Sequence, residues 1–294
     1  MKKEIRVVNQ DKGIVQVTTT DERWYIRAST DPITGLPRHE FVPSVTWIAE
    51  HYPKGIGFYK WLANTGWDES QALKEAAGDK GSKIHTAVAL LLAGKTVKMD
   101  DAITNPSTGN PEPLTLEEYQ AVMSFKAWHD ATKPVLVAAD QVVWNDVDGY
   151  AGTVDFVCAI DGQLTIIDFK TSKAIYPSHR MQVSAYKRAA PEWKDATLAI
   201  LQLGYAKNRL GYKFTEVEDC YHLFLAAQMI WKEETTGQAP LQRDYPLSLT
   251  LNPTQEAPCA PSGEDGKTTN GSPLTSGLPA KSRKSNTTST VSTT

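Results

Sequence analysis

The sequence predicts an α/β protein in which a central mixed sheet is flanked by helices. Strand-like runs rich in β-branched and aromatic residues alternate with segments of helical periodicity through the second half of the chain. The dipeptide Asp161-Gly162 also predicts a tight turn that joins two of these runs into a hairpin, because a type I′ turn needs positive φ at both central residues.

Composition limits the class of protein. The chain has 294 residues, enough for one large domain or two small ones, and 40% hydrophobic residues, enough for a substantial core. Its formal net charge is −3, so any attraction to nucleic acid must come from a local patch. The apolar runs are too short for a bilayer, and no secretory signal opens the chain. We therefore expect no membrane partner.

The cysteines favour a reducing compartment. The three of them, Cys158, Cys220 and Cys259, cannot all pair with one another and have no metal-type spacing. A cytoplasmic location, in a bacterium or a phage-infected host cell, fits best.

We expect three regions along the chain. Residues 1–42 form a β-rich segment, with short strands over 4–28 and a loop over 30–37. Residues 43–250 form the main domain. Residues 251–294 contain Pro, Ser, Thr, Gly and Asn without any aromatic residue, which predicts a disordered tail because such a segment buries too little apolar surface to offset ordering.

The main domain begins with an extra N-terminal helical extension. Ser44 is the expected N-cap of its first helix, and helical pattern returns over 56–64 and 69–77. The run Gly78-Asp79-Lys80-Gly81 is expected to break the pattern, so that Ser82 caps a separate helix that ends before Gly94. Core packing is the favoured interpretation of Trp47, Trp61 and Trp67, and stacking of exposed rings on nucleobases is the alternative.

The remaining elements alternate between helix and strand. The expected helices and strands are a helix over 116–131, a strand from 134 to 144, the hairpin over 152–171, a helix capped by Ser178, strands over 197–205 and 211–215, and a helix over 216–234.

The hairpin turn fixes a register. If Asp161 and Gly162 are the loop residues, Ile160 faces Gln163, and Asp155 lies opposite Asp168 with Cβ atoms roughly 4.5–5.5 Å apart. Alternation places Lys170 on the same face as Asp168.

Two opposed carboxylates repel unless a cation lies between them. The alternative interpretation is a surface hairpin whose acids are opposed by chance. Strongly apolar neighbours such as Val154 and Ile167 argue for a buried hairpin, where charges are paired or bind metal. Hard divalent cations such as Mg²⁺ take oxygen ligands of this kind.

Four further features surround the hairpin. His85 borders the apolar stripe of its helix, where a lone histidine is more often structural than a ligand. Gln182 and Tyr186 are four residues apart and face the same way on one helix. A basic run that includes Lys173, Arg180, Lys187 and Arg188 follows Lys170, with no acidic residue before Glu192.

Taken in order, these residues resemble the PD-(D/E)XK nuclease superfamily over roughly 43–232. The matching elements are His85, Gly152-Thr-Val-Asp155, Asp168-Phe-Lys170 and Gln182-x-x-x-Tyr186. The pattern is most similar to the RecB-like exonuclease branch, which includes phage exonucleases and the mitochondrial genome maintenance exonuclease. A lone D…DxK is weak, but the ordered set is much more specific. The resemblance implies a restriction-endonuclease-like sheet.

The resemblance also implies roles for these residues. His85, Asp155, Asp168 and the backbone carbonyl of Phe169 would bind Mg²⁺ or Mn²⁺, and Lys170 would act on water and phosphate beside the catalytic Asp155 and Asp168. Gln182 and Tyr186 would organise the site and contact the substrate strand. The basic run, with Lys173 and Arg180, would contact phosphates. Asp140 loosely matches an accessory acid that is usually Glu in relatives.

The expected function is therefore metal-dependent hydrolysis of DNA in recombination, repair or replication, by an exonuclease on single strands or ends with little sequence preference. A structure-specific endonuclease and a non-catalytic nucleic-acid-binding module are the alternatives. A helicase or recombination protein would be a natural partner. Two departures from the family occur: Val154 replaces the proline, and the scattered cysteines predict no iron–sulfur cluster.

Overall fold

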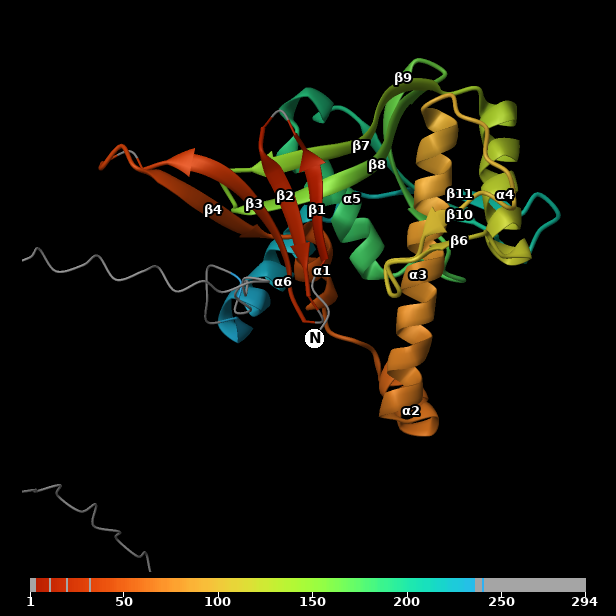
Figure 1. Cartoon of the computed structure of the whole chain (residues 1–294), viewed down its shortest axis with the longest axis horizontal. Coiled ribbons are helices and arrows are strands. Elements are labelled where there is room, and N and C mark those ends of the chain that lie inside the picture. The colour runs from red at the N-terminus through yellow and green to blue at the C-terminus, as the bar shows by residue number, and fades with distance from the viewer. Residues whose placement is uncertain (1–3, 11, 20, 32, 236–239, 241–294) are drawn as a thin grey trace, which may run out of the picture. The chain divides into compact units, whose positions relative to one another are not determined.

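The computed structural model describes residues 4–10, 12–19, 21–31, 33–235 and 240 (Figure 1). The predicted tail over 251–294 and Cys259 lie outside the described residues. The described part is a mixed α/β structure, as the sequence predicts. None of its helices combines the length and the apolar character that crossing a membrane requires.

A five-stranded mixed sheet forms the centre of the fold. Its strand order is β11-β10-β9-β8-β7; β9 and β10 run parallel, and the other neighbours run antiparallel. The parallel pair needs a crossover connection, which helix α5 supplies. The bounds are β7 Val135–Asn145, β8 Tyr150–Ile160, β9 Gln163–Lys170, α5 Pro177–Ala189, β10 Thr197–Leu203 and β11 Tyr212–Val217, with a 3-10 turn at Pro191–Trp193.

Helices cover both faces of this sheet. Along β9, Ile166 packs into a core with α1, α5 and α6, whereas the next residue, Ile167, packs into a second core with α3 and α4. This alternation follows from the two-residue period of a strand. The helices are α1 Val45–Glu50, α2 Ile56–Thr65, α3 Trp67–Leu92, α4 Leu116–Thr132 and α6 Tyr221–Glu234.

A separate four-stranded antiparallel sheet precedes the helices, in the order β1-β2-β3-β4. The expected loop over 30–37 is shorter than predicted, because β4 pairs with β3 from Thr30 opposite Pro37 onward. A short hairpin of two strands, β5 and β6, each two residues long, lies between α3 and α4, where the residue composition predicts a surface loop over 99–114. The bounds are β1 Glu4–Asn9, β2 Ile14–Thr18, β3 Arg23–Thr30, β4 Pro37–Pro43, β5 Ile103–Thr104 and β6 Pro111–Glu112.

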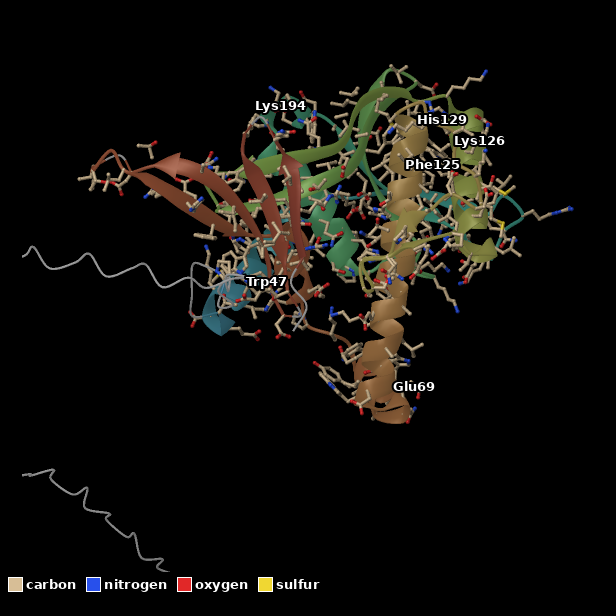
Figure 2. All side chains as sticks on the ribbon, in the orientation of Figure 1. Trp47, Glu69, Phe125, Lys126, His129 and Lys194 are labelled. Atoms are coloured by element: carbon tan, nitrogen blue, oxygen red, sulfur yellow. The ribbon has the colours of Figure 1, made fainter. Side chains whose placement is uncertain are left out.

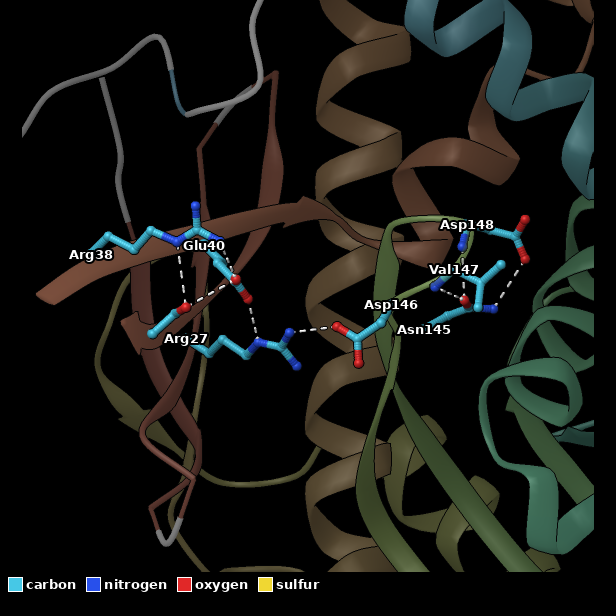
Figure 3. A network of polar contacts seen from close by, with 8 residues as sticks. Arg27, Arg38, Glu40, Asn145, Asp146, Val147 and Asp148 are labelled. Atoms are coloured by element: carbon cyan, nitrogen blue, oxygen red, sulfur yellow. Dashed lines mark hydrogen bonds and ion pairs between the residues drawn. The ribbon is translucent and has the colours of Figure 1, made fainter. Parts of the chain in front are cut away.

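The first sheet is attached to the second by polar contacts. Figure 3 shows Arg27 on β3 between Glu40 on β4, at 2.6 Å, and Asp146 in the turn between β7 and β8. The same guanidinium lies 4.3 Å from the ring of Trp144. Nearby, the hydroxyls of Tyr25 and Thr153 are 2.8 Å apart. These contacts fix the N-terminal strands against β7 and β8.

The predicted break at Gly78–Gly81 is wrong, because α3 continues through it as one helix of 26 residues. Neither glycine adopts the positive φ that would end a helix. Glycine in a helix interior costs only about 1 kcal/mol, and the contacts of the following turns outweigh that cost. The strongest of them joins Lys83 Nζ to Glu118 Oε2 at 2.8 Å.

Two of the three early tryptophans are not in a core. Trp47 packs edge-on against Trp24 and Trp231, with centroids 5.3 and 5.2 Å away, as expected. Trp61 and Trp67 are instead 41% and 67% exposed, so their core interpretation is wrong. Trp61 lies on α2, which contains no buried residue, and Trp67 is the first residue of α3.

Two other boundaries differ from the prediction. Helix α5 begins at Pro177 with Tyr176 as its N-cap, so Ser178 lies inside the helix. The residues from Glu216 to Val217 belong to β11, and α6 begins at Tyr221. Glu216 pairs with Ala199 across the sheet, a tertiary contact that periodicity does not reveal.

Candidate active site

The predicted hairpin is present, and its register is confirmed up to one pair before the acids. Asp161 and Gly162 have φ of 50° and 82°, and the pairing runs from Ile160 opposite Gln163 to Phe156 opposite Ile167. The described backbone pairing stops there, so the expected position of Asp155 opposite Asp168, one pair further on, stays a prediction.

At this point a side chain replaces the backbone acceptor. Asp155 Oδ2 accepts a hydrogen bond of 2.8 Å from the N–H of Phe169. In a regular antiparallel pairing this N–H would donate to a backbone carbonyl of β8, and here it donates to the Asp155 carboxylate instead. The end of the pairing thus turns the Asp155 carboxylate toward β9, the strand that carries the other acid.

Gly152 is required by the packing beside the site. A Cβ at this position would lie 2.5 Å from Tyr186 Cε1 and 3.1 Å from a methyl group of Val45. Tyr186, on α5, is buried at this contact. The glycine therefore allows α5 to lie closely against β8.

The predicted core residues of the site lie together. Lys170 Nζ is 2.6 Å from Asp168 Oδ2 and donates a 2.9 Å hydrogen bond to Gln182 Oε1 on α5. Phe169 points to the other face and packs in the α3 and α4 core, as predicted from alternation. Gln182 thus holds the lysine that lies against Asp168.

His85 reaches the same place from α3. Its Nδ1 lies 3.2 Å from Asp155 Oδ1, and its Nε2 lies 3.1 Å from the carbonyl oxygen of Phe169. A lone histidine on such a helix is more often structural than a ligand, but His85 contacts two of the other three predicted ligand groups.

The two carboxyls have opposite electrostatic environments. Burial is the main reason that the pKa of Asp168 rises to about 6; Lys170 opposes the rise, and Asp155 adds to it. Burial also acts to raise the pKa of Asp155, but His85, Lys170 and the Phe169 N–H outweigh it, so that pKa falls below its ordinary value. Burial acts to lower the pKa of His85, and Asp155 reverses this to a net rise. His85 and Lys170 thus act against the effect of burial on the two carboxyls.

The residues fit a divalent cation chemically. Within the part of the chain that the structure describes, no three His, Cys, Asp or Glu side chains form a ready-made metal-binding group. The imidazole and the ammonium engage the candidate ligands instead. Even so, Asp168 Oδ2 is buried without a hydrogen-bond partner despite its ion pair. Two carboxylates, an imidazole and a carbonyl oxygen form a donor set that hard cations accept.

The remaining predicted residues vary in their distance from this cluster. Tyr186 is buried, and burial together with the two acids raises its pKa well above the ordinary value. Asp140 has a φ of 50° and pairs with Arg6 at 2.8 Å. Burial and then Asp155 raise the pKa of Asp140, with Arg6 opposing them, so its carboxyl lies within electrostatic reach of the site.

The basic run is divided by the fold. Lys173 is exposed just after β9, and Arg180 on the first turns of α5 lies 3.9 Å from Glu218. Arg188, at the other end of α5, lies 5.0 Å from the ring of Tyr221 on α6. The run therefore does not form one continuous patch: Lys173 and Arg180 lie at one end of α5 and Arg188 at the other.

One residue near the site escaped prediction. Lys54 precedes α2, and it combines with burial and Lys170 to lower the pKa of His179 on α5 to about 3. Lys54 and Lys170 act on the same histidine, so Lys54 belongs to the electrostatic surroundings of the site. No spacing or motif signals such a residue, because only the tertiary fold brings it there.

No protein-family model matches the chain, and no curated protein matches it. The interpretation of the site therefore depends on its own residues, their distances and their burial.

Proposed function

We propose that this chain is a metal-dependent deoxyribonuclease of the PD-(D/E)XK type with a restriction-endonuclease-like sheet. The observation that carries the proposal is the meeting of Asp155, Asp168 and Lys170 with His85 and the Phe169 carbonyl. These groups come from the β8–β9 hairpin and from α3, which is far from the hairpin in the sequence. A chance surface hairpin would not bring a histidine from another helix to the same acids.

The residues divide the work of phosphodiester hydrolysis. His85, Asp155, Asp168 and the Phe169 carbonyl would hold Mg²⁺ or Mn²⁺, which supplies an activated water and neutralises charge on the phosphate when bound. Lys170, held by Gln182, is positioned to donate a hydrogen bond to the attacking water or to a phosphate oxygen. In the metal-free protein, His85 and Lys170 offset the acids, so binding of a cation should release protons.

We infer that the enzyme acts on DNA ends or single strands. Lys173, just after β9, and Arg180, on the first turns of α5, could contact phosphates without reading bases. A nuclease of this kind fits recombination, repair or replication.

Digestion of end-labelled substrates tests the proposal. Linear single-stranded, linear duplex and closed circular DNA should be incubated with Mg²⁺, with Mn²⁺ and with a chelator. We expect linear DNA to be shortened from its ends, circles to survive, and the chelator to stop the reaction. Cleavage of circles would instead indicate an endonuclease.

A matched pair of variants assigns the activity to the site. Asp168→Asn should reduce cleavage by about 10³-fold or more, because it removes a charged ligand. Asp161→Asn makes the same chemical change in the exposed turn of the hairpin, where asparagine tolerates the positive φ, and should leave cleavage unchanged. Equal activity of Asp168→Asn and the unmodified protein would refute the assignment, and binding without cleavage would favour a non-catalytic module.

A further inference from the structure

One face of α3 leads from an exposed tryptophan to the candidate active site. Trp67 and His85 are 18 residues apart, which is five turns at 3.6 residues per turn, so they lie on the same side of the helix. Lys74, Gly78 and Gly81 fall within about 40° of the line between them. Trp67 and Lys74 are exposed, and none of these residues belongs to a core.

The two glycines on this face have no explanation within the chain. Glycine is a poor helix former, and both residues have ordinary helical backbone. A Cβ at Gly78 would meet nothing within 4 Å, and one at Gly81 would meet only Thr171 Oγ1, at 3.8 Å. Neither backbone conformation nor crowding therefore requires them. Close approach of a ligand to the helix surface remains as a physical reason for the absence of side chains.

The residue types on this face suit a single nucleic-acid strand. Trp67 exposes a large ring that can stack on a base, and Lys74 offers a cation to phosphate. The acidic residues of the same turns, Asp68, Glu69, Glu75 and Asp79, lie about 80–160° away from the line. The aromatic rings of Phe58, Tyr59 and Trp61 on α2 are also 41–54% exposed. Exposed aromatic groups of this size mark interaction sites.

An open cleft borders the same face. Lys54, Tyr59 and Lys74 line it, opposite Trp47 and Glu50 on α1, and its volume is about 540 Å³. Lys74 lies 3.9 Å from Glu50 across it. Figure 1 shows that α2 and the first turns of α3 extend away from the sheets, so a strand could reach this face from solvent.

We propose that the face Trp67-Lys74-Gly78-Gly81 guides the single-stranded part of the substrate to the site at His85. This inference rests on the proposed nuclease function and deepens it. The distance along the helix from Trp67 to His85 is about 27 Å, which spans up to about eight nucleotides at a stacked spacing of 3.4 Å, and fewer if the strand is extended. Substrates shorter than this span cannot engage both ends.

Binding of single strands without cleavage tests this inference. The full chain is titrated, in chelator, into 5′-labelled oligothymidylates of 4 and 12 nucleotides, and fluorescence anisotropy is recorded. Trp67→Ala should weaken binding of the 12-mer about tenfold, the effect of losing one stacked base. Leu73→Ala is the matched control, since Leu73 is half exposed on a different side of α3. The 4-mer should show little difference between Trp67→Ala and the unmodified protein.

The glycine gives the sharper test. Gly78→Leu should weaken binding of the 12-mer about tenfold although it favours the helix, because it blocks the face, whereas Ala77→Leu on another side should bind normally. Circular dichroism confirms folding of each variant. Normal binding by Gly78→Leu would overturn the proposal. Light scattering provides a second check: if the unmodified protein is a dimer and Gly78→Leu is a monomer, the glycine serves contact between two copies of the chain, and the proposal is also overturned.

The two proposals fail separately. Loss of binding in both variants without any DNA cleavage by the unmodified protein would retain the strand-binding face and reject the nuclease. DNA cleavage by the unmodified protein, together with normal binding by both variants, would retain the nuclease and reject the strand-binding face.

Discussion

The two halves of α3 lie in opposite environments although they form one helix. From Trp67 to Gly78 every residue is exposed except Ser70, whereas Lys83, Ile84, Ala87 and Val88 are buried in the following turns. Figure 2 shows Glu69 on the first half, away from Phe125 and His129 on α4, which lie beside the second half. The buried half positions His85, and the exposed half is free to contact a ligand.

This difference separates stability from binding within one element. Many buried contacts fix the position of the second half, so substitutions there should affect the stability of the whole fold. The first half has few tertiary contacts, so changes there should affect local opening and ligand affinity. Four predictions compare buried positions at or near the site with exposed ones, in order of decreasing effect.

Breaking the buried ion pair should have the largest effect. Lys83 and Glu118 are 4% and 7% exposed, so Glu118→Ala leaves a buried ammonium with only the Pro113 carbonyl as acceptor and should cost about 3–5 kcal/mol of unfolding free energy. Glu118 also accepts from the Thr115 N–H in the capping box of α4. Chemical denaturation measures the loss. Glu117→Ala, which removes an exposed partner of Lys80, is the control and should cost under about 1 kcal/mol; similar losses in both variants would contradict the comparison.

Adding one methyl group beside the site should have the next largest effect. Gly152→Ala places a Cβ 2.5 Å from the ring of buried Tyr186, and the displacement should cost about 1–3 kcal/mol. Gly57→Ala adds the same group on α2, where nothing lies within 4 Å, and should not destabilise the protein. Thermal unfolding of the two variants compares them, and an unchanged midpoint for Gly152→Ala would mean that α5 can move away at little cost.

The sequence predicted well what short-range chemistry decides. The Asp161-Gly162 turn and its register were found because positive φ at two adjacent positions is a local requirement. The continuity of α3 was missed because it depends on Lys83 meeting Glu118, a contact between segments far apart in the chain. Likewise, an aromatic residue such as Trp67 carries no local sign of whether a neighbour will cover it.

The sequence predicted which residues lie at the candidate site better than it predicted their geometry. Asp168 and Lys170 share a face as alternation requires. The hydrogen bond from the Phe169 N–H to Asp155 could not be foreseen, because it depends on where the pairing of β8 with β9 stops.

Removing the buried charge of Asp168 should stabilise the metal-free protein. Because its carboxyl pKa is raised to about 6, the folded state binds the proton more tightly than the unfolded chain, and ionisation destabilises the fold as pH rises from about 4 through 6. Asp168→Asn should therefore gain about 1–2 kcal/mol at pH 7 in chelator, allowing for the lost ion pair with Lys170.

The pH dependence distinguishes this cause from a general effect. The advantage of Asp168→Asn should shrink as pH falls below about 6 and vanish near 4, where the carboxyl of the unmodified protein is already protonated. Denaturation midpoints at several pH values measure it. A loss of stability at pH 7 would mean that the ion pair with Lys170 stabilises the fold more than burial of its carboxylate opposes it.

The smallest effect concerns the exposed half of α3 and should be local. Gly78→Ala removes backbone freedom from the unfolded chain and adds a methyl group that meets no neighbour, so it should stabilise the helix by about 0.5–1 kcal/mol. If the first half opens independently of the fold, hydrogen exchange should slow for amides of residues 67–80 while exchange over 83–92 and global unfolding stay unchanged. An equal gain in global stability would show instead that the two halves of α3 unfold together. The two halves would then differ in solvent exposure but belong to one cooperative unfolding unit.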